Sequence, residues 1–275
     1  MYYQLNNNRY WVEQYGTGMP VLLFHGFTGS TETWQSYVKR WKHYRLIVID
    51  LPGHGQTHTE VPVSTESFCE DVSELLTQLE IKRCHIVGYS MGGRMALSFA
   101  MLYPRQVVLL VLESASPGLA NVDEQIARQA KDETLATMLE EQGITTFVDK
   151  WENIPLFDSQ KQLPETIKQR IREERLQQSP SGLAASLRGM GTGSQPAWWN
   201  KLSECSVPVL LVVGAYDHKF VAIANKMKKQ LPFAALHVIS KAGHAIHVEQ
   251  MELFDTIVTE FLNRFAKDGG FYYDN

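Results

Sequence analysis

The sequence predicts an α/β fold with one mostly parallel sheet, and three observations support this. Short apolar, β-branched runs alternate along the chain with segments whose apolar residues recur at helical spacing. One long interval, residues 116–204, contains no candidate strand. Hydrophobic residues make up 44% of the 275 residues and charged residues 20%, which is typical of a globular protein and not of a disordered one.

Eight segments have the composition of strands. Tyr2–Leu5 and Tyr10–Tyr15 flank the turn-forming Asn6-Asn7-Asn8 and predict a hairpin. The other six are apolar almost throughout, as buried parallel strands are. These six are Val21–Phe24, Leu46–Leu51, Cys84–Gly88, Val107–Leu112, Val209–Val213 and Leu236–Ile239.

Helices are predicted between these strands and after them. Two clear examples are the apolar series that begin at Phe68 and at Phe254. Residues 116–204 are too many for a loop, so we expect a helical lid inserted after the sixth strand, over the crevice at the carboxyl ends of the strands. Residues 1–115 and 205–275 would then form the core, with a frayed tail over Lys267–Asn275.

Composition also excludes several classes of protein. The net charge of -4 gives no basic excess, which argues against nucleic-acid binding. The three cysteines, Cys69, Cys84 and Cys205, are far apart and form no CxxC pair, so we expect neither a disulfide framework nor a cysteine metal site. No apolar run approaches a membrane span, and the first residues lack the apolar core of a signal peptide. We expect a soluble cytoplasmic protein, a monomer or a small homo-oligomer.

The segment from Gly88 to Gly92 has the Gly-x-Ser-x-Gly pattern of a nucleophile elbow. It follows a predicted strand and precedes a helical run, which is the context that this motif requires. Ser90 would occupy a strained turn that projects its hydroxyl from the sheet. The two glycines are expected because a Cβ atom at either position would collide with the neighbouring strand or helix.

A second loop, His25-Gly26-Phe27, directly follows an earlier strand. In this arrangement the backbone N–H groups of Phe27 and of Met91, the residue after the nucleophile, are expected to form an oxyanion hole. We interpret His25 as a structural hydrogen-bonding residue and not as a catalyst. His54, in a tight turn after the next strand, has the same interpretation.

The partners of the serine should follow it in the order acid, then histidine. Asp217 lies just after one late strand and His244 just after the last, so Asp217 would orient His244, which would hold the proton of Ser90. His247 is the alternative histidine, but it lacks the preceding glycine. Glu113 is the alternative acid. The histidines show no HExxH spacing and no GxGxxG or P-loop follows the first strand, so we expect no metal and no cofactor.

With elbow, oxyanion loop and triad in place, the chain resembles the α/β-hydrolase superfamily over almost its whole length. Several further segments together resemble a narrower family, the 2-succinyl-6-hydroxy-2,4-cyclohexadiene-1-carboxylate (SHCHC) synthases of menaquinone biosynthesis. These segments are Gly88-Tyr89-Ser90-Met91-Gly92-Gly93-Arg94, Ser116-Pro117-Gly118-Leu119, Ala127-Arg128-Gln129, Trp151, Arg188-Gly189-Met190-Gly191-Thr192-Gly193 and Asp217-His218-Lys219-Phe220. The resemblance implies that the triad eliminates pyruvate from a precursor without hydrolysing an ester.

The substrate that the resemblance implies carries several carboxylates, which arginine side chains bind well. Arg94 is expected at the pocket floor; the alternative is a salt bridge that packs the elbow helix. Arg128 matches a lid arginine of the family, and Arg175 matches another less securely, with Arg188 as the alternative. Trp151 matches a pocket aromatic, or belongs to the lid core. The expected substrate contacts are therefore Tyr89, Arg94, Arg128, Trp151, Arg175 and Arg188.

Three functions remain open at this stage. The first is a carbon–oxygen lyase in which Ser90 acts as a general base on a small polycarboxylate substrate. The second is a carboxylesterase or C–C bond hydrolase in which Ser90 is acylated and water deacylates it. The third is a ligand-binding receptor on a hydrolase scaffold, which would have no need of a complete triad.

Overall fold

The computed structural model describes residues 1–59 and 61–266, so the predicted tail Lys267–Asn275 lies outside the described residues. Eight strands of the described chain form one sheet in the order β1-β2-β4-β3-β5-β6-β7-β8. β1 pairs with β2, and β2 with β4, in antiparallel fashion, whereas the remaining neighbours are parallel. The strands are β1 (Tyr2–Leu5), β2 (Asn8–Tyr15), β3 (Met19–Phe24), β4 (Tyr44–Ile49), β5 (Cys84–Tyr89), β6 (Val107–Glu113), β7 (Val209–Gly214) and β8 (Ala234–Ile239).

The predicted eight-stranded, mostly parallel sheet is therefore confirmed, and the differences are confined to strand ends. β4 begins at Tyr44, which pairs with Met19 of β3, two residues before the apolar run that predicted it. β8 begins at Ala234, also two residues early. β8 is an edge strand whose residues are mostly exposed or half-buried, so its first positions carry no apolar signal.

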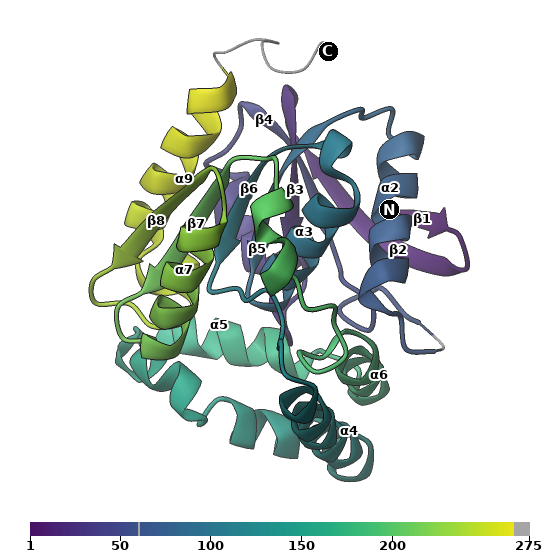
Figure 1. Ribbon diagram of the computed structural model, residues 1–275. Coiled ribbons are helices and arrows are strands. Elements are labelled where there is room, and N and C mark those ends of the chain that lie inside the picture. Colours follow the sequence, from purple (N-terminus) through teal and green to yellow (C-terminus); the bar gives the residue numbers. More distant parts are fainter. Residues whose placement is uncertain (60, 267–275) are drawn as a thin grey trace.

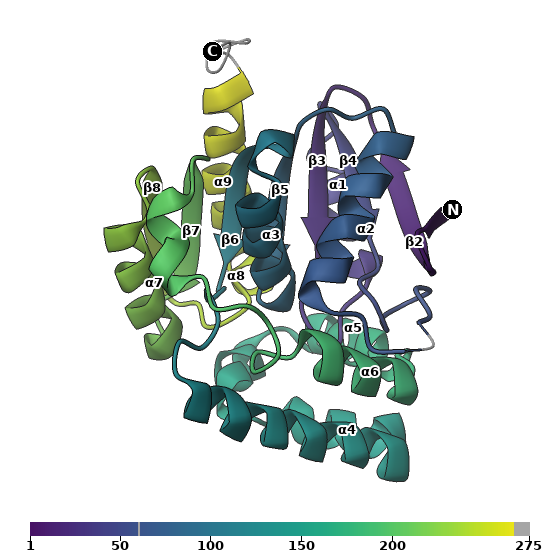
Figure 2. The same ribbon diagram turned by 45° about the vertical axis from the view of Figure 1, so that its right-hand side comes forward.

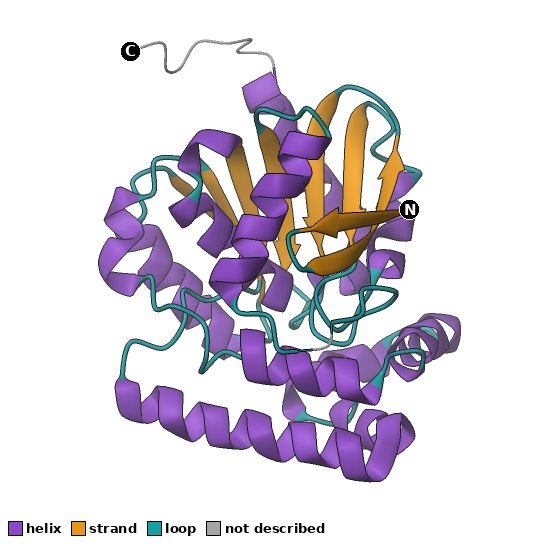
Figure 3. Cartoon of the chain, turned by 90° about the vertical axis from the view of Figure 1, so that its right-hand side faces the viewer, coloured by secondary structure: helices purple, strands orange, loops and turns teal. Residues whose placement is uncertain are grey.

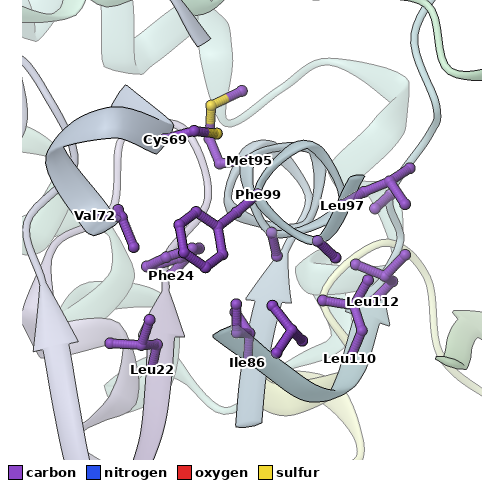
Figure 4. Packing of buried hydrophobic residues seen from close by; sticks show 14 of the residues in the cluster. Leu22, Phe24, Cys69, Val72, Ile86, Met95, Leu97, Phe99, Leu110 and Leu112 are labelled. Atoms are coloured by element: carbon purple, nitrogen blue, oxygen red, sulfur yellow. The ribbon is translucent and has the colours of Figure 1, made fainter. Parts of the chain in front are cut away.

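Helices cover both faces of the sheet (Figure 1). α2 (Thr65–Gln78), α3 (Met91–Leu102) and α7 (His218–Gln230) pack on one face, where Phe99 of α3 lies among apolar side chains from α2, β3, β5 and β6 (Figure 4). The other face packs against Trp34, Tyr37 and Phe254. The elements on that face are η1 (Thr31–Trp34), α1 (Gln35–Val38), α8 (Ile246–Glu249) and α9 (Met251–Ala266).

A layer of helices joins β6 to β7 and lies across the carboxyl ends of the strands (Figures 2 and 3). Its longest helix, α4 (Val122–Trp151), bends where Gly143 adopts φ 76° and ψ 175°. A small apolar cluster of its own includes Leu139, Phe147 and Leu183. The elements between β5 and β7 that complete the chain are η2 (Pro104–Gln106), α4 (Val122–Trp151), η3 (Pro155–Gln162), α5 (Glu165–Leu176), α6 (Pro180–Met190) and η4 (Trp199–Glu204).

This helical layer docks tightly on the core at one glycine pair. A Cβ atom on Gly53, in the loop after β4, would lie 2.1 Å from the carbonyl oxygen of Gly182 on α6, and a Cβ on Gly182 would lie 2.4 Å from the oxygen of Gly53. The two backbones can approach this closely only without side chains. The Gly-rich turn after β4 therefore forms the surface on which α6 packs.

Two further features bear on the class of protein. Cys69, Cys84 and Cys205 are buried free thiols. None of the helices in residues 1–59 and 61–266 is long and apolar enough to span a bilayer.

Candidate active site

Ser90 lies at a sharp turn between β5 and α3, with φ 50° and ψ -106°. This conformation is strained for any residue other than glycine. The flanking glycines allow the turn: a Cβ atom on Gly88 would lie 2.5 Å from the carbonyl oxygen of Gly92, and one on Gly92 would lie 2.3 Å from that of Phe24. The turn has the geometry that the motif predicted, and its strain presents the serine at the carboxyl edge of the sheet.

The structure brings the three predicted triad residues together. The Nε2 atom of His244 lies 2.9 Å from the hydroxyl oxygen of Ser90, and its Nδ1 atom lies 2.6 Å from Oδ2 of Asp217. Asp217 follows β7 and also caps α7, because its Oδ1 accepts the N–H of Phe220 at 3.2 Å. His244 and Asp217 are both buried. The arrangement allows the imidazole to take the proton of the serine while the carboxylate fixes its orientation.

The alternative histidine and the alternative acid bond to each other. Both the backbone N–H and the Nδ1 atom of His247 lie 2.9 Å from the carboxylate of Glu113. This buried pair packs against the rings of Trp34 and Tyr89. Since Glu113 is bound to His247, it does not hold His244, and the sequence-based preference for Asp217 agrees with the geometry.

The loop after β3 holds Phe27 beside the serine turn. Gly29 donates its N–H to the carbonyl of Gly26 at 3.0 Å, and Thr28 adopts φ 70°. The N–H of Phe27 bonds to no other atom of the described residues. Met91 is the first residue of α3, where N–H groups lack a partner within the helix. The two N–H groups predicted for an oxyanion hole are thus available to a ligand.

His25 has the structural role that the sequence predicted. Its Nε2 atom accepts the N–H of Leu51 at 3.0 Å, which requires a neutral ring. Burial, together with the neighbouring His54, holds the pKa of His25 well below its usual value. Burial likewise lowers the pKa of His54 to about 4. Both rings therefore stay neutral at pH 7.

Arg94 is a buried cation without an acidic partner. Its Nη1 atom donates to the carbonyl of Met190 at 2.8 Å and to the side chain of Gln195, and no carboxylate of the described residues lies within ion-pair distance. Burial and the nearby charge of Arg128 lower the pKa of Arg94 to about 9. The alternative interpretation, a salt bridge that packs the elbow helix, is therefore not seen, although Arg94 does contact the helical layer. Arg128 bonds through Nε to Asp132 at 2.8 Å.

Arg175 is the second buried guanidinium that forms no ion pair within the described chain. It lies over the ring of Phe157, with Cζ 4.7 Å from the ring centroid, and burial lowers its pKa. Together with Tyr89, Gln160 and His247 it lines a cavity of about 300 Å³. The Tyr89 ring lies 5.6 Å from that of His244, so this cavity adjoins the triad.

Trp151 joins the helical layer to the oxyanion loop. Its ring stacks on Phe147 at 5.4 Å and meets Phe27 edge-on at the same distance. The indole nitrogen is buried and has no partner among the described residues. Trp151 therefore belongs to the core of this layer, and its role as a pocket aromatic stays a prediction.

Arg188 lies apart from the other predicted contacts. Its guanidinium is partly exposed and bonds to both Glu133 and Glu140 at 2.6–2.9 Å. Two neighbouring carboxylates already neutralise it, and the structure does not bring it to the triad. No group of three or more metal-ligating side chains occurs in the described part of the chain.

Comparison with known proteins decides the family. Residues 19–250 match the α/β hydrolase fold family. A Bacillus subtilis (strain 168) protein, provisionally named 2-succinyl-6-hydroxy-2,4-cyclohexadiene-1-carboxylate synthase, is 47% identical over 88% of this chain and 89% of its own length. A synthase of the same name from Escherichia coli O1:K1 / APEC is 32% identical over 84% of this chain and 89% of its own length. The chain belongs to the SHCHC synthase family of α/β hydrolases.

Solved structures agree with this assignment. The structure of MenH from S. aureus superposes on this chain with a TM-score of 0.89 at 37% identity, over 93% of this chain and 98% of that one. An enol-lactonase from Burkholderia xenovorans LB400 superposes with a TM-score of 0.83 at 18% identity, which shows a shared fold alone.

Sequence reasoning missed several residues of the candidate active site. Phe157 and Gln160, on η3, line the cavity beside Tyr89. Phe220 packs edge-on against the ring of His244 at 4.7 Å. Gln195 bonds to Arg94. Phe220 lies three residues after Asp217, so the segment Asp217-His218-Lys219-Phe220 could have indicated it. Phe157, Gln160 and Gln195 come from segments without a motif, and only the tertiary fold brings them to the site.

Proposed function

We propose that this chain eliminates pyruvate from 2-succinyl-5-enolpyruvyl-6-hydroxy-3-cyclohexene-1-carboxylate to form SHCHC in menaquinone biosynthesis. The observation that carries the proposal is a hydrogen-bonded Ser90–His244–Asp217 triad together with two buried arginines, Arg94 and Arg175, that form no ion pair within the described residues. An unpaired buried guanidinium is costly unless an anion completes it. The relatives that bear the synthase name support the same reaction.

In this proposal Ser90 acts as a general base and not as a nucleophile. His244, oriented by Asp217, takes the proton of the Ser90 hydroxyl, and the serine oxygen removes the proton on the ring carbon next to the succinyl carbonyl. The 2.9 Å contact between Nε2 and the hydroxyl oxygen is within reach for this transfer. No acyl-enzyme forms.

The electrons of the broken C–H bond pass to the succinyl carbonyl, whose oxygen becomes an enolate. The N–H groups of Phe27 and Met91 would hold this oxygen, as they would hold the oxyanion of a hydrolase. When the carbonyl reforms, a double bond forms between the deprotonated ring carbon and its neighbour, and the existing ring double bond shifts by one position. The ring C–O bond to the enolpyruvyl group breaks in the same step. The leaving enolpyruvate takes up the abstracted proton and becomes pyruvate, so no cofactor is needed.

The arginines would bind the carboxylates of the precursor. Arg94 and Arg128 are close enough for their charges to interact, and Arg175 faces the cavity beside Tyr89. Guanidinium groups bind carboxylates through two parallel hydrogen bonds, which fixes orientation as well as charge. Trp151 would contribute its unused indole N–H. Arg188 we place outside the binding site, because Glu133 and Glu140 bind it.

We further propose that residues 116–204 act as the lid of this site and that residues 1–115 and 205–275 form the core. The helical layer supplies Arg128, Trp151 and Arg175, whereas the core supplies the triad. Covering the site would exclude water and strengthen the electrostatic contacts within it. The free thiols are in keeping with work in the cytoplasm, and the proposed active unit is a monomer or a small homo-oligomer.

Replacing Arg94 tests the carboxylate-binding role. Arg94→Ala should lower kcat/KM for the precursor by about one to two orders of magnitude, since a charge-assisted contact in a sheltered site is worth roughly 1.5–3 kcal/mol. Arg94→Lys should restore only part of the loss, because an ammonium cannot form the two-point contact. Steady-state kinetics on the precursor and on a small neutral ester, with the melting temperature, provide the measurement.

Arg188→Ala is the matched control, because it removes a guanidinium that acids already neutralise. It should leave kcat/KM for the precursor close to the wild-type value. If Arg94→Ala impaired both substrates alike and lowered the melting temperature, Arg94 would be a packing residue, and the carboxylate-binding role would be wrong.

A further inference from the structure

Glu174 is a partly buried glutamate of α5 that pairs with no cation in the described part of the chain. One oxygen, Oε1, accepts three hydrogen bonds from the core: from the N–H of Ser30 at 2.8 Å, from its hydroxyl at 3.0 Å, and from the hydroxyl of Thr33 at 2.7 Å. Burial raises the pKa of this carboxyl, and these donors oppose the shift. The three hydrogen bonds offset part of the cost of burying this carboxylate.

The core side of this contact is the end of the oxyanion loop. Ser30 caps η1 and lies three residues after Phe27, whose N–H is proposed to hold the enolate. Between them, Thr28 adopts φ 70°, a strained conformation that its surroundings must hold in place. Glu174 bonds to the backbone at the last residue of this turn. A second carboxylate, Asp50, holds the next N–H, that of Thr31, at 2.7 Å from within the core.

The other side of the contact is the helix that carries Arg175. Successive residues of an α-helix point about 100° apart, so fixing the direction of Glu174 also fixes that of Arg175. Arg175 forms no ion pair within the described residues, and its guanidinium lies over the ring of Phe157. The position of this guanidinium therefore depends on the position of α5. Residues of the helix and of the loop both line the cavity that adjoins Tyr89.

We propose that Glu174 is a positioning residue that ties α5 to the oxyanion loop, so that Arg175 and the N–H of Phe27 reach their places together. This inference rests on the proposed function for the roles of those two groups. In this proposal Glu174 acts through these two groups and not on the reacting atoms. Its effect is to make binding of a carboxylate and stabilisation of the enolate depend on one contact between the helical layer and the core.

The test compares three variants of the full chain. Glu174→Ala removes the acceptor, Glu174→Gln keeps an oxygen acceptor without the charge, and Glu165→Ala removes an exposed glutamate of the same helix that bonds only to Lys168. For Glu174→Ala we expect kcat to fall and KM to rise together, with kcat/KM lower by roughly 10–100-fold, as for a small misplacement of catalytic groups. Glu174→Gln should recover most of both losses, and Glu165→Ala should match the wild type.

Amide hydrogen exchange gives a second readout that does not depend on the reaction. Glu174→Ala should exchange faster in residues 26–34 and also in residues 165–178, whereas Glu165→Ala should not change the first segment. If the wild type makes no pyruvate, the proposed function fails, and this exchange comparison alone decides the role of Glu174. The inference would be overturned if residues 26–34 of Glu174→Ala exchanged at the same rate as in the wild type. It would also be overturned if Glu174→Ala lowered the melting temperature but left kcat and KM unchanged.

Discussion

Ser90→Ala should lower kcat for pyruvate release by about four orders of magnitude or more while leaving the fold intact. The hydroxyl is the group that removes the proton in the proposed reaction, and no neighbouring side chain replaces it. Alanine tolerates φ 50° about as well as serine and leaves almost no cavity, so the melting temperature should stay within about 3 °C. Single-turnover kinetics and a thermal melt measure the two effects.

Two further variants make this result specific. Adding His244→Ala to Ser90→Ala should cost little more, because the triad acts as one unit. Ser98→Ala is the matched serine: its hydroxyl accepts the indole N–H of Trp198 at 2.9 Å and lies on the same helix. Leaving that buried donor unpaired should cost about 1–3 kcal/mol of stability with little change in kcat. Substantial turnover by the Ser90→Ala variant would show that another group is the base.

Asp217→Asn should lower kcat by about four orders of magnitude, which is the second largest effect expected. The carboxylate accepts the Nδ1 proton of His244 at 2.6 Å and so keeps Nε2 free to receive the serine proton. An amide in its place favours the other tautomer and removes the charge that stabilises an imidazolium. Asparagine can still cap α7 through its oxygen, so the stability of the fold should change little.

Glu113→Gln is the control for this prediction, because Glu113 binds the other histidine of the region, His247. Its substitution weakens a buried hydrogen-bonded pair and should lower the free energy of unfolding more than it lowers kcat. Comparing kcat and urea unfolding for the two variants separates the roles. A near-normal kcat in Asp217→Asn would mean that a different carboxylate serves His244.

The triad was predictable because each of its members follows a strand. The elbow motif fixes Ser90 locally, and the carboxyl ends of parallel strands meet at one edge of the sheet, which brings Asp217 and His244 to it. The same reasoning distinguished His244 from His247, since only the former has the glycine before it. Strand ends were predicted less well, as Tyr44 and Ala234 show, because backbone pairing continues past the apolar residues that give the signal.

The helical layer was predictable as a unit but not in its contacts. Charged residues recur along it, and the sequence does not show which face of each helix meets the core. Arg175 is buried although it lies on the densely charged α5, whereas Arg188, on the mostly apolar α6, is partly exposed. Packing of η3 and α5 against the loops of the core creates the contacts of Phe157, Gln160 and Glu174. Such contacts depend on tertiary packing, which short sequence motifs do not predict.

The most direct test of the account follows pyruvate and the cyclohexadiene product together. The purified chain is supplied with 2-succinyl-5-enolpyruvyl-6-hydroxy-3-cyclohexene-1-carboxylate, pyruvate is coupled to lactate dehydrogenase, and the diene is followed by its absorbance, beside a panel of p-nitrophenyl esters. The account predicts that pyruvate and diene appear in equal amounts, with ester hydrolysis slow or undetectable. Rapid hydrolysis of the esters with no pyruvate and no diene would contradict it and would identify the chain as a serine hydrolase.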